Sequence, residues 1–218
     1  MSSSQSYTCA STSTTNTTTV DPTPQYIGLI KEFSSIQFKL TGTYNGKSEN
    51  VSFGYTSTSP QPGIYNVSAT ETSNSTVLSA IFIVDSNNDS VLSAEYGGQQ
   101  LPSAYAKTIF DSSLGLFGLQ RTYTSELGVF TDPTYVTNQG MSTMAFGTTS
   151  FPVTTYVANS SNEVVNYCGV SATITAFTLQ VGTPPGTSIQ FITYLHFVGT
   201  AQGETEAATW QLVSMTIR

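Results

Sequence analysis

The segment formed by residues 188–198 constrains the fold most strongly, because apolar side chains alternate along it as they do along a β-strand. Its more apolar face would carry Ile189, Phe191, Thr193, Leu195 and Phe197. The opposite face is also at least half apolar, which is typical of a strand covered on both sides. We therefore expect this strand in the middle of a sheet, with residues 209–217 returning beside it after a glycine turn.

Other segments alternate in the same way and are separated by turn residues, which predicts about ten to twelve strands in all. They span residues 34–43, 51–55, 64–69, 77–84, 91–96, 142–146, 153–158, 164–170 and 172–181. Asn45 and Gly46 separate the first two, and an Asn-Gly pair is the strongest short hairpin signal. The sequence therefore predicts an all-β fold, either an antiparallel β-sandwich or one strongly curved antiparallel sheet.

Residues 103–119 are the only good helix candidate, because their large apolar side chains follow helical spacing. These side chains are Tyr105, Ile109, Phe110, Leu114 and Phe117. Ser103 is the expected N-cap, residues 26–32 fit either a short helix or a strand, and residues 121–140 fit a loop. The helix would pack against one side of the sheet or, alternatively, form a lid over a lipid or ligand pocket.

Composition divides the chain into a Ser/Thr-rich N-terminal extension, residues 1–25, and a single β domain, residues 26–218. The first 20 residues contain 13 Ser or Thr and no charged side chain, so they cannot build a core of their own. Thr-rich sequence nevertheless favours β structure. A disordered stalk and a strand added to a neighbouring subunit are both compatible with this extension.

Charged residues make up only 9% of the chain, against about 25% in an ordinary soluble domain, so hydroxyl and amide groups must build the surface. Such a surface is unchanged when carboxylates lose their charge near pH 4. We therefore predict an extracellular or cell-surface protein and favour a hot, acidic setting, against which the acid-labile bonds after Asp21 and Asp132 count. The net charge of −7 argues against nucleic acid and anionic membrane surfaces as partners.

No apolar run reaches the roughly 18 residues of a membrane-spanning helix, so no membrane span is expected. Residues 1–7 lack both the basic and the apolar region of a signal peptide. Export would then require a leader that has been removed, or release by another route such as the lysis of a virus-producing cell.

Two kinds of covalent modification are predicted from motifs. Six Asn-x-Ser/Thr sequons, about twice the number expected by chance, are candidate N-glycosylation sites: Asn16, Asn50, Asn66, Asn74, Asn88 and Asn159. Accidental sequons in a Ser/Thr-rich chain are the alternative. The two cysteines, Cys9 and Cys168, form an even count, which predicts a disulfide in an exported protein, with two free thiols as the alternative.

Catalytic chemistry finds little support. His196 is the single histidine, and every histidine-dependent triad would have to use it. It lies within residues 188–198, where a histidine packs or faces outward far more often than it catalyses. Glu204 and Glu206 share one strand face and form a candidate carboxylate pair, but their place beside a glycine turn fits an exposed edge equally well. We predict no catalytic residue and no enzyme activity.

Metal and cofactor motifs are equally weak. Asp85, Asn87 and Asp89 begin like a calcium loop, but Ser90 stands where that loop needs glycine and Glu95 falls one residue short of the last ligand. A polar hairpin turn is the better interpretation. The cysteine spacing fits no zinc site, and no phosphate loop or dinucleotide fingerprint is present, so we predict no metal and no cofactor.

The layout of an uncharged Thr-rich extension, a proline-marked joint and an all-β head with sequons resembles archaeal surface filaments of the thread type. That resemblance implies a glycosylated structural subunit that polymerises with copies of itself through the N-terminal extension. A curved sheet with an apolar helix on one face is similar, alternatively, to carriers of the lipoprotein-localisation type, which implies a sizeable apolar pocket with residues 103–119 as its lid. A virion turret or capsid surface protein is a third reading.

Overall fold

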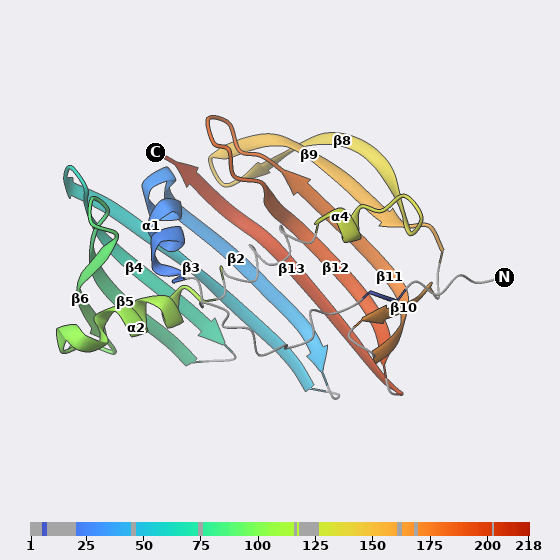
Figure 1. Cartoon of the computed structure of the whole chain (residues 1–218), viewed down its shortest axis with the longest axis horizontal. Helices are drawn as coiled ribbons and strands as arrows, with labels where there is room; N and C mark the ends of the chain where they lie inside the picture. Colours follow the sequence, from blue (N-terminus) through green and yellow to red (C-terminus); the bar gives the residue numbers. More distant parts are fainter. Residues whose placement is uncertain are drawn as a thin grey trace.

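A computed structural model describes residues 6–7, 21–44, 47–73, 76–115, 117, 127–160, 163–167, 170–201 and 203–218. The fold is mostly β: the strands form one large antiparallel sheet that does not close, accompanied by short helices (Figure 1). This confirms the predicted fold class, and it selects the single sheet from the two architectures that the sequence left open.

The strands are β1 Ser6–Tyr7, β2 Phe33–Tyr44, β3 Lys47–Gln61, β4 Ile64–Ser73, β5 Thr76–Asp85, β6 Ser90–Tyr96, β7 Gln99–Gln100, β8 Val136–Phe146, β9 Thr149–Ala158, β10 Glu163–Tyr167, β11 Val170–Gly182, β12 Phe191–Ala201 and β13 Glu204–Ile217. The helices are α1 Thr23–Glu32, α2 Ser103–Ser113 and α4 Leu127–Phe130.

The strand order is β1-β10-β11-β12-β13-β2-β3-β4-β5-β6-β7, and the β8–β9 hairpin joins this path where β9 pairs with β11. Apart from the two-residue β1, which runs parallel to β10, the paired strands are antiparallel. β12 lies between β11 and β13, as its alternating sequence predicts. The pairing of β13 with β2 joins the two ends of the domain into one sheet.

The sheet bends sharply near the β8–β9 turn. Gly147, in that turn, bridges to Met215 of β13, although β11 and β12 separate the two segments in the strand order. The approach is close enough to need glycine, because the backbone has φ 67° and a Cβ would lie 3.1 Å from the Cβ of Ser214. The β8–β9 hairpin therefore extends the sheet beyond β11 and curls back so that its turn reaches β13.

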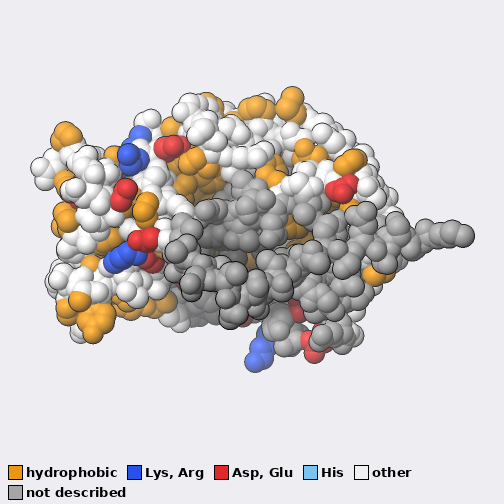
Figure 2. Space-filling view, in the orientation of Figure 1, with side chains coloured by type: hydrophobic (Ala, Val, Ile, Leu, Met, Phe, Trp, Pro, Cys, Tyr) orange, Lys and Arg blue, Asp and Glu red, His pale blue; other side chains and the backbone are white. Residues whose placement is uncertain are grey.

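The two faces of the sheet differ in chemistry. The inner face carries the apolar core and is covered by α1 and α2, which lie on the same side of the sheet (Figure 1). Along β3, for example, Phe53 and Tyr55 are buried while Ser52 and Thr56 are exposed. Figure 2 shows how few charged side chains lie on the visible surface, in keeping with the composition.

The helices follow the sequence in part. The candidate at residues 103–119 is confirmed as α2, but α2 ends at Ser113 and its N-cap is Pro102, without a side-chain cap, instead of Ser103. Residues 26–32 are helical, within an α1 that begins at Thr23. Proline in the first turn of α1 favours this start, because its missing N–H has no helical partner there.

One prediction for the middle of the chain is wrong. Residues 121–140 are not all loop, because α4 and the beginning of β8 at Val136 lie within them. The first half of β8 is too polar to alternate, and its register comes from pairing with β9, interrupted by an irregularity between Asn138 and Gly140. The predicted Asn45–Gly46 turn lies outside the described residues, but the flanking Tyr44 and Lys47 pair as a two-residue hairpin requires.

Two neighbouring residues of β5 provide a test of this assignment of faces. Phe82 is fully buried, whereas Ile83, on the opposite face, is 39% exposed. We expect Phe82→Ala to lower the free energy of unfolding by about 3–5 kcal/mol, because it leaves a cavity in the core. Ile83→Ala should cost about 1 kcal/mol or less. Urea denaturation measures both values, and equal losses would contradict the assignment.

Candidate functional site

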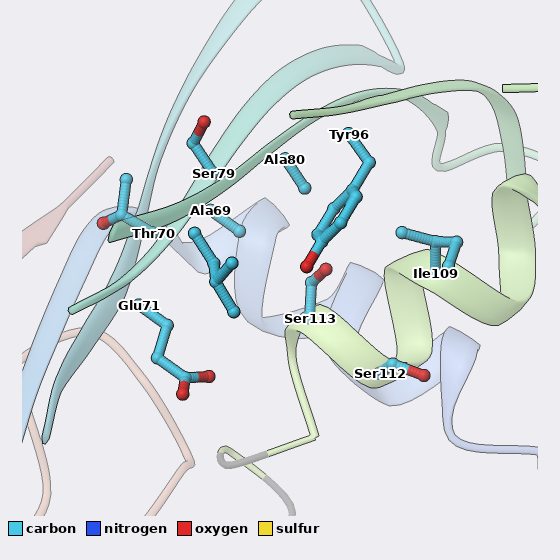
Figure 3. A pocket seen from close by; sticks show the side chains of 10 residues that line it. Ala69, Thr70, Glu71, Ser79, Ala80, Tyr96, Ile109, Ser112 and Ser113 are labelled. Carbon is cyan, nitrogen blue, oxygen red and sulfur yellow. The ribbon is translucent and has the colours of Figure 1, made fainter. Parts of the chain in front are cut away.

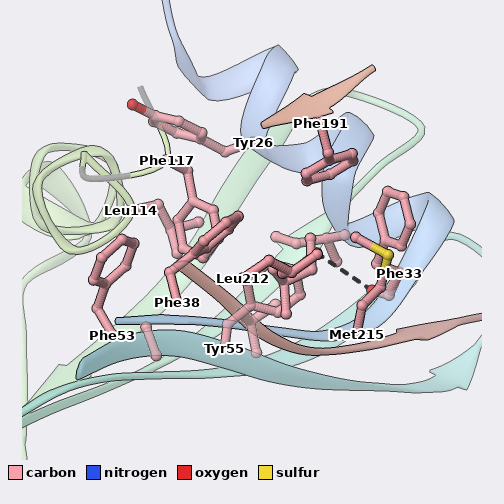
Figure 4. Close-up of a cluster of buried hydrophobic side chains, with 14 of the residues drawn as sticks. Tyr26, Phe33, Phe38, Phe53, Tyr55, Leu114, Phe117, Phe191, Leu212 and Met215 are labelled. Carbon is pink, nitrogen blue, oxygen red and sulfur yellow. Dashed lines mark hydrogen bonds between the residues drawn. The ribbon is translucent and has the colours of Figure 1, made fainter. Parts of the chain in front are cut away.

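An aromatic cluster fills the inner face of the sheet just beyond α2 (Figure 4). Phe38 of β2, Phe53 of β3 and Trp210 of β13 are each no more than 5% exposed. The Trp210 ring lies 4.8 Å from that of Phe38 and 5.2 Å from that of Phe53, measured between centroids. Tyr55 continues the cluster along β3, so neighbouring strands from both ends of the chain supply one aromatic surface.

Phe117 lies on this surface. Its ring centroid is 5.8 Å from that of Phe38, 5.6 Å from that of Phe53 and 5.5 Å from that of Tyr55. The first two contacts are edge-to-face, the geometry that aromatic pairs prefer. Leu114, at the C-cap of α2, is also buried. Phe117, just beyond the end of α2, therefore inserts its ring among the apolar side chains of the inner face. We call Phe117, its three aromatic neighbours and Trp210 the aromatic chamber.

A depression of about 250 Å³ lies beside the aromatic chamber, between the last turn of α2 and strands β4 to β6 (Figure 3). Ala69, Leu78, Ala80 and Ile109 give it an apolar floor, and Glu71 is its one charged lining residue. Its remaining lining residues are Thr70, Ser79, Tyr96, Ser112 and Ser113. A second depression, of about 300 Å³, is lined by residues of β2, β3 and β13, mainly ones with hydroxyl side chains. Neither is the sizeable apolar pocket that the carrier resemblance implies; aromatic side chains fill the apolar face instead.

Charged groups connect the two helices. Lys107 of α2 donates to Asp21 Oδ1 at 2.7 Å and to Asp111 Oδ2 at 2.8 Å, and the Thr23 hydroxyl donates to Asp111 Oδ1 at 2.6 Å. We call these four residues the helix latch. The Lys107 hydrogen bond, with the backbone N–H of Thr23, holds the pKa of Asp21 below its usual range. The bonds to Asp111 and Asp21 raise the pKa of Lys107.

The other end of α1 is held by Arg218, which sequence reasoning missed. Its Nε donates to the Ile30 carbonyl at 3.0 Å, and its Nη2 donates to Ser57 Oγ at 2.6 Å. The guanidinium also lies 4.8 Å from the centroid of the Tyr65 ring, a cation–π distance. Arg218 thus ties α1 to β3 and β4. The periodicity of apolar residues in the sequence does not predict such a contact, because the contact joins residues far apart in the chain.

The candidate catalytic residues do not meet in one place. His196 is half-buried in β12, and its Nδ1 lies 2.9 Å from the Thr209 hydroxyl on β13. Glu204 and Glu206 lie at the start of β13, beside the Gly203 turn. These three side chains come from positions outside the aromatic chamber.

The calcium-like segment forms the turn between β5 and β6. Asp85 Oδ1 accepts from the Asn87 backbone N–H at 2.9 Å, and Asp85 Oδ2 accepts from Asn88 Nδ2 at 2.6 Å. The Asn88 bond, then the Asn87 bond, lowers the pKa of Asp85. Both carboxylate oxygens of Asp85 therefore accept hydrogen bonds from residues of the turn itself. Among the described residues, no group of three His, Cys, Asp or Glu side chains is placed to hold a metal ion.

The predicted modification sites are only partly described. Cys9, Cys168, Asn16 and Asn74 lie outside the described residues. The other four sequon asparagines are all exposed: Asn50, Asn66, Asn88 and Asn159. Close to the two cysteines in sequence, Tyr7 of β1 pairs with Tyr167 of β10.

Comparison with known proteins places the chain in no family. No family model matches it, and a search of curated proteins gives no match. Within the described part of the chain, no helix is long and apolar enough to cross a membrane.

The helix latch should depend on pH in a definite way. Because the pKa of Asp21 is lowered in the folded state, its contribution is present above its usual pKa of about 3.9 and is lost as the pH falls through the folded value. Because the pKa of Lys107 is raised, its contribution is present below about pH 10.4 and is lost as the pH rises through the folded value.

We therefore expect Lys107→Gln to lower the Tm by about 1–3 °C at pH 6, since the ion pair is exposed. The difference from the parent should shrink at pH 2, because Asp21 gains a proton as the pH falls through its lowered folded-state pKa. Calorimetry at both values measures this, with Lys31→Gln as a matched control on α1, an exposed lysine outside the helix latch. A difference that is the same at both pH values would contradict the assigned contacts.

Proposed function

We propose that this protein is an exported binding protein for an apolar ligand of the lipid class, and that the helix-covered face of its sheet is the ligand site. The observation that carries the proposal is the position of Phe117 among Phe38, Phe53 and Tyr55. The Phe117 side chain there occupies an aromatic surface that an acyl chain would also fit. Withdrawal of Phe117 would free its place on that surface without unpairing any described strand.

The architecture supports this reading. A single sheet that does not close, with α1 and α2 on one face, has the layout of the lipoprotein-localisation carriers that the sequence resembles. Within the helix latch, the Lys107–Asp21 ion pair is exposed, so this contact can be exchanged for water at little cost. The hydrogen bond from the buried Thr23 to Asp111 and the packing of Tyr26 on Phe110 hold α1 against α2. The ligand would therefore replace Phe117 in the aromatic chamber.

Trp210 makes the proposal directly testable, because it is the only tryptophan of the chain and lies in the aromatic chamber. A brominated fatty acid quenches tryptophan only when the two are nearly in contact. We expect saturable quenching of Trp210 fluorescence in the native protein. Phe117→Ala should bind the fatty acid about tenfold more tightly, because the ligand no longer has to displace a buried aromatic side chain.

Phe177→Ala is the matched control, since Phe177 stacks on Phe130, outside the aromatic chamber. It should leave the affinity of the parent unchanged. Unquenched fluorescence in both the parent and the Phe117 variant would overturn the proposal. An equal increase in fatty-acid affinity in the Phe117→Ala and Phe177→Ala variants would show that the aromatic chamber is not the site.

A second candidate function is supported by a different observation. Ser6 and Tyr7 form a parallel strand on β10, in register with Asn166 and Tyr167. Edge strands present unpaired N–H and C=O groups that accept an added strand. Residues 8–22 give the extension a reach of about 50 Å, so the same pairing can form within one chain or with a neighbouring copy. If the protein is a glycosylated structural subunit of a thread-type filament, this strand must pair with a neighbouring copy.

Deletion of residues 1–20 separates these arrangements. If the extension binds a neighbour, light scattering should show a large assembly for the full chain and a monomer for the truncated one. On a non-reducing gel, a bond between Cys9 and Cys168 of different copies would then give a covalent ladder that Cys9→Ser abolishes. A monomeric full chain whose internal disulfide is found by peptide mapping would exclude polymerisation through the extension.

A further inference from the structure

The four described sequon asparagines differ in how their side-chain amides are used. N-glycosylation replaces one hydrogen of Asn Nδ2 with the anomeric carbon of a sugar, so an acceptor needs an Nδ2 that faces solvent and a hydrogen that the fold does not require. Exposure alone does not separate these residues, because all four are exposed. Their hydrogen bonds and their places in the sheet do separate them.

Asn159 has both amide hydrogens engaged. Its Nδ2 donates to the Pro133 carbonyl at 3.0 Å and to the Thr134 carbonyl at 3.1 Å, and its Oδ1 accepts from the Thr137 hydroxyl. The amide therefore joins the end of β9 to the turn that precedes β8. A sugar on Nδ2 would replace one of these bonds and would be directed against the turn. Asn159 is a structural residue.

Asn50 and Asn66 are different. In the part of the chain that the structure describes, neither side chain makes a hydrogen bond. Phe53 and Val67 point to the buried face, so strict alternation places both asparagines on the outer face, on the adjacent strands β3 and β4. The hydroxyl residue of each sequon lies two positions further and shares that face. Asn88 is an intermediate case, because its side-chain amide donates a single hydrogen bond, to Asp85.

The outer face also carries apolar side chains that no described residue covers. Ile81 and Ile83 of β5 are 47% and 39% exposed, and the cross-strand neighbours of Ile83 are Asn66 on β4 and Ser93 on β6. A glycan on Asn66 would begin one strand away from Ile83. The carbon-bound hydrogens of its first sugars can pack on these isoleucines, so a carbohydrate fits this patch.

We propose that Asn50 and Asn66 carry N-glycans on the outer face, that the Asn66 glycan covers Ile83 and Ile81, and that Asn159 stays unmodified. In the transfer, Asn Nδ2 forms a C–N bond with the anomeric carbon of a lipid-phosphate-linked oligosaccharide. The lipid phosphate leaves with the electron pair of the broken C–O bond, and the amide nitrogen loses one proton. The inference shares with the proposed function only the premise that the protein is exported.

Glycopeptide mapping of the protein from its native source tests the assignment. We expect sugar on the peptides that contain Asn50 and Asn66 and an unmodified Asn159 peptide. Sugar on Asn159, or bare asparagine at both Asn50 and Asn66, would overturn the inference. Quenching of Trp210 by the brominated fatty acid in a sugar-free protein would leave the proposed function intact, so the two failures are distinguishable.

A second measurement uses protein produced without glycosylation. Asn159→Asp keeps the side-chain shape but replaces two donated hydrogen bonds with a carboxylate that faces two carbonyls. We expect its Tm to fall by about 3–6 °C. The matched variants Asn50→Asp and Asn66→Asp should stay within about 1 °C of the parent. An Asn159→Asp protein as stable as these controls would contradict the structural role of Asn159.

Discussion

The pairing of β13 with β2 is the contact on which the rest of the structure depends. It joins residues near the end of the chain to residues near the start of the domain, with Trp210 opposite Leu40 and Met215 opposite Ile36. Strands β3 to β7 extend the sheet on one side of this pair, and β12 to β10 extend it on the other. Without it there would be two smaller sheets, and neither would bring Trp210 beside Phe38.

The helices depend on the same pairing. Arg218 follows β13 directly, and its contacts with Ile30 and Ser57 hold the end of α1 on the inner face. The helix latch then connects the start of α1 to α2. The covering layer is thus held at one end by Arg218, where β13 meets β2, and at the other by the helix latch together with the packing of Tyr26 on Phe110. Phe117 lies beyond the end of α2.

Sequence patterns predicted the parts of the fold that local physics determines. The alternation of apolar and polar residues predicted β12 and β13. The helical spacing of apolar residues predicted α2 and included Phe117 among the side chains that face the sheet. The start of β8 escaped prediction because Thr137 to Gly140 are polar and take their register from β9. The aromatic chamber escaped because its members come from three strands and one helix-flanking segment. The helix latch and the Arg218 contacts join residues that no local pattern connects.

The surfaces proposed for ligand, glycan and assembly occupy different parts of one sheet. The aromatic chamber lies on the inner face, Asn50 and Asn66 lie on the outer face, and the site of the N-terminal strand is the β10 edge. A glycan on the outer face would hinder stacking of copies through that face, yet it would leave the edges accessible. Binding of an apolar ligand and addition of a strand are therefore sterically compatible, because each uses a surface that the other leaves open.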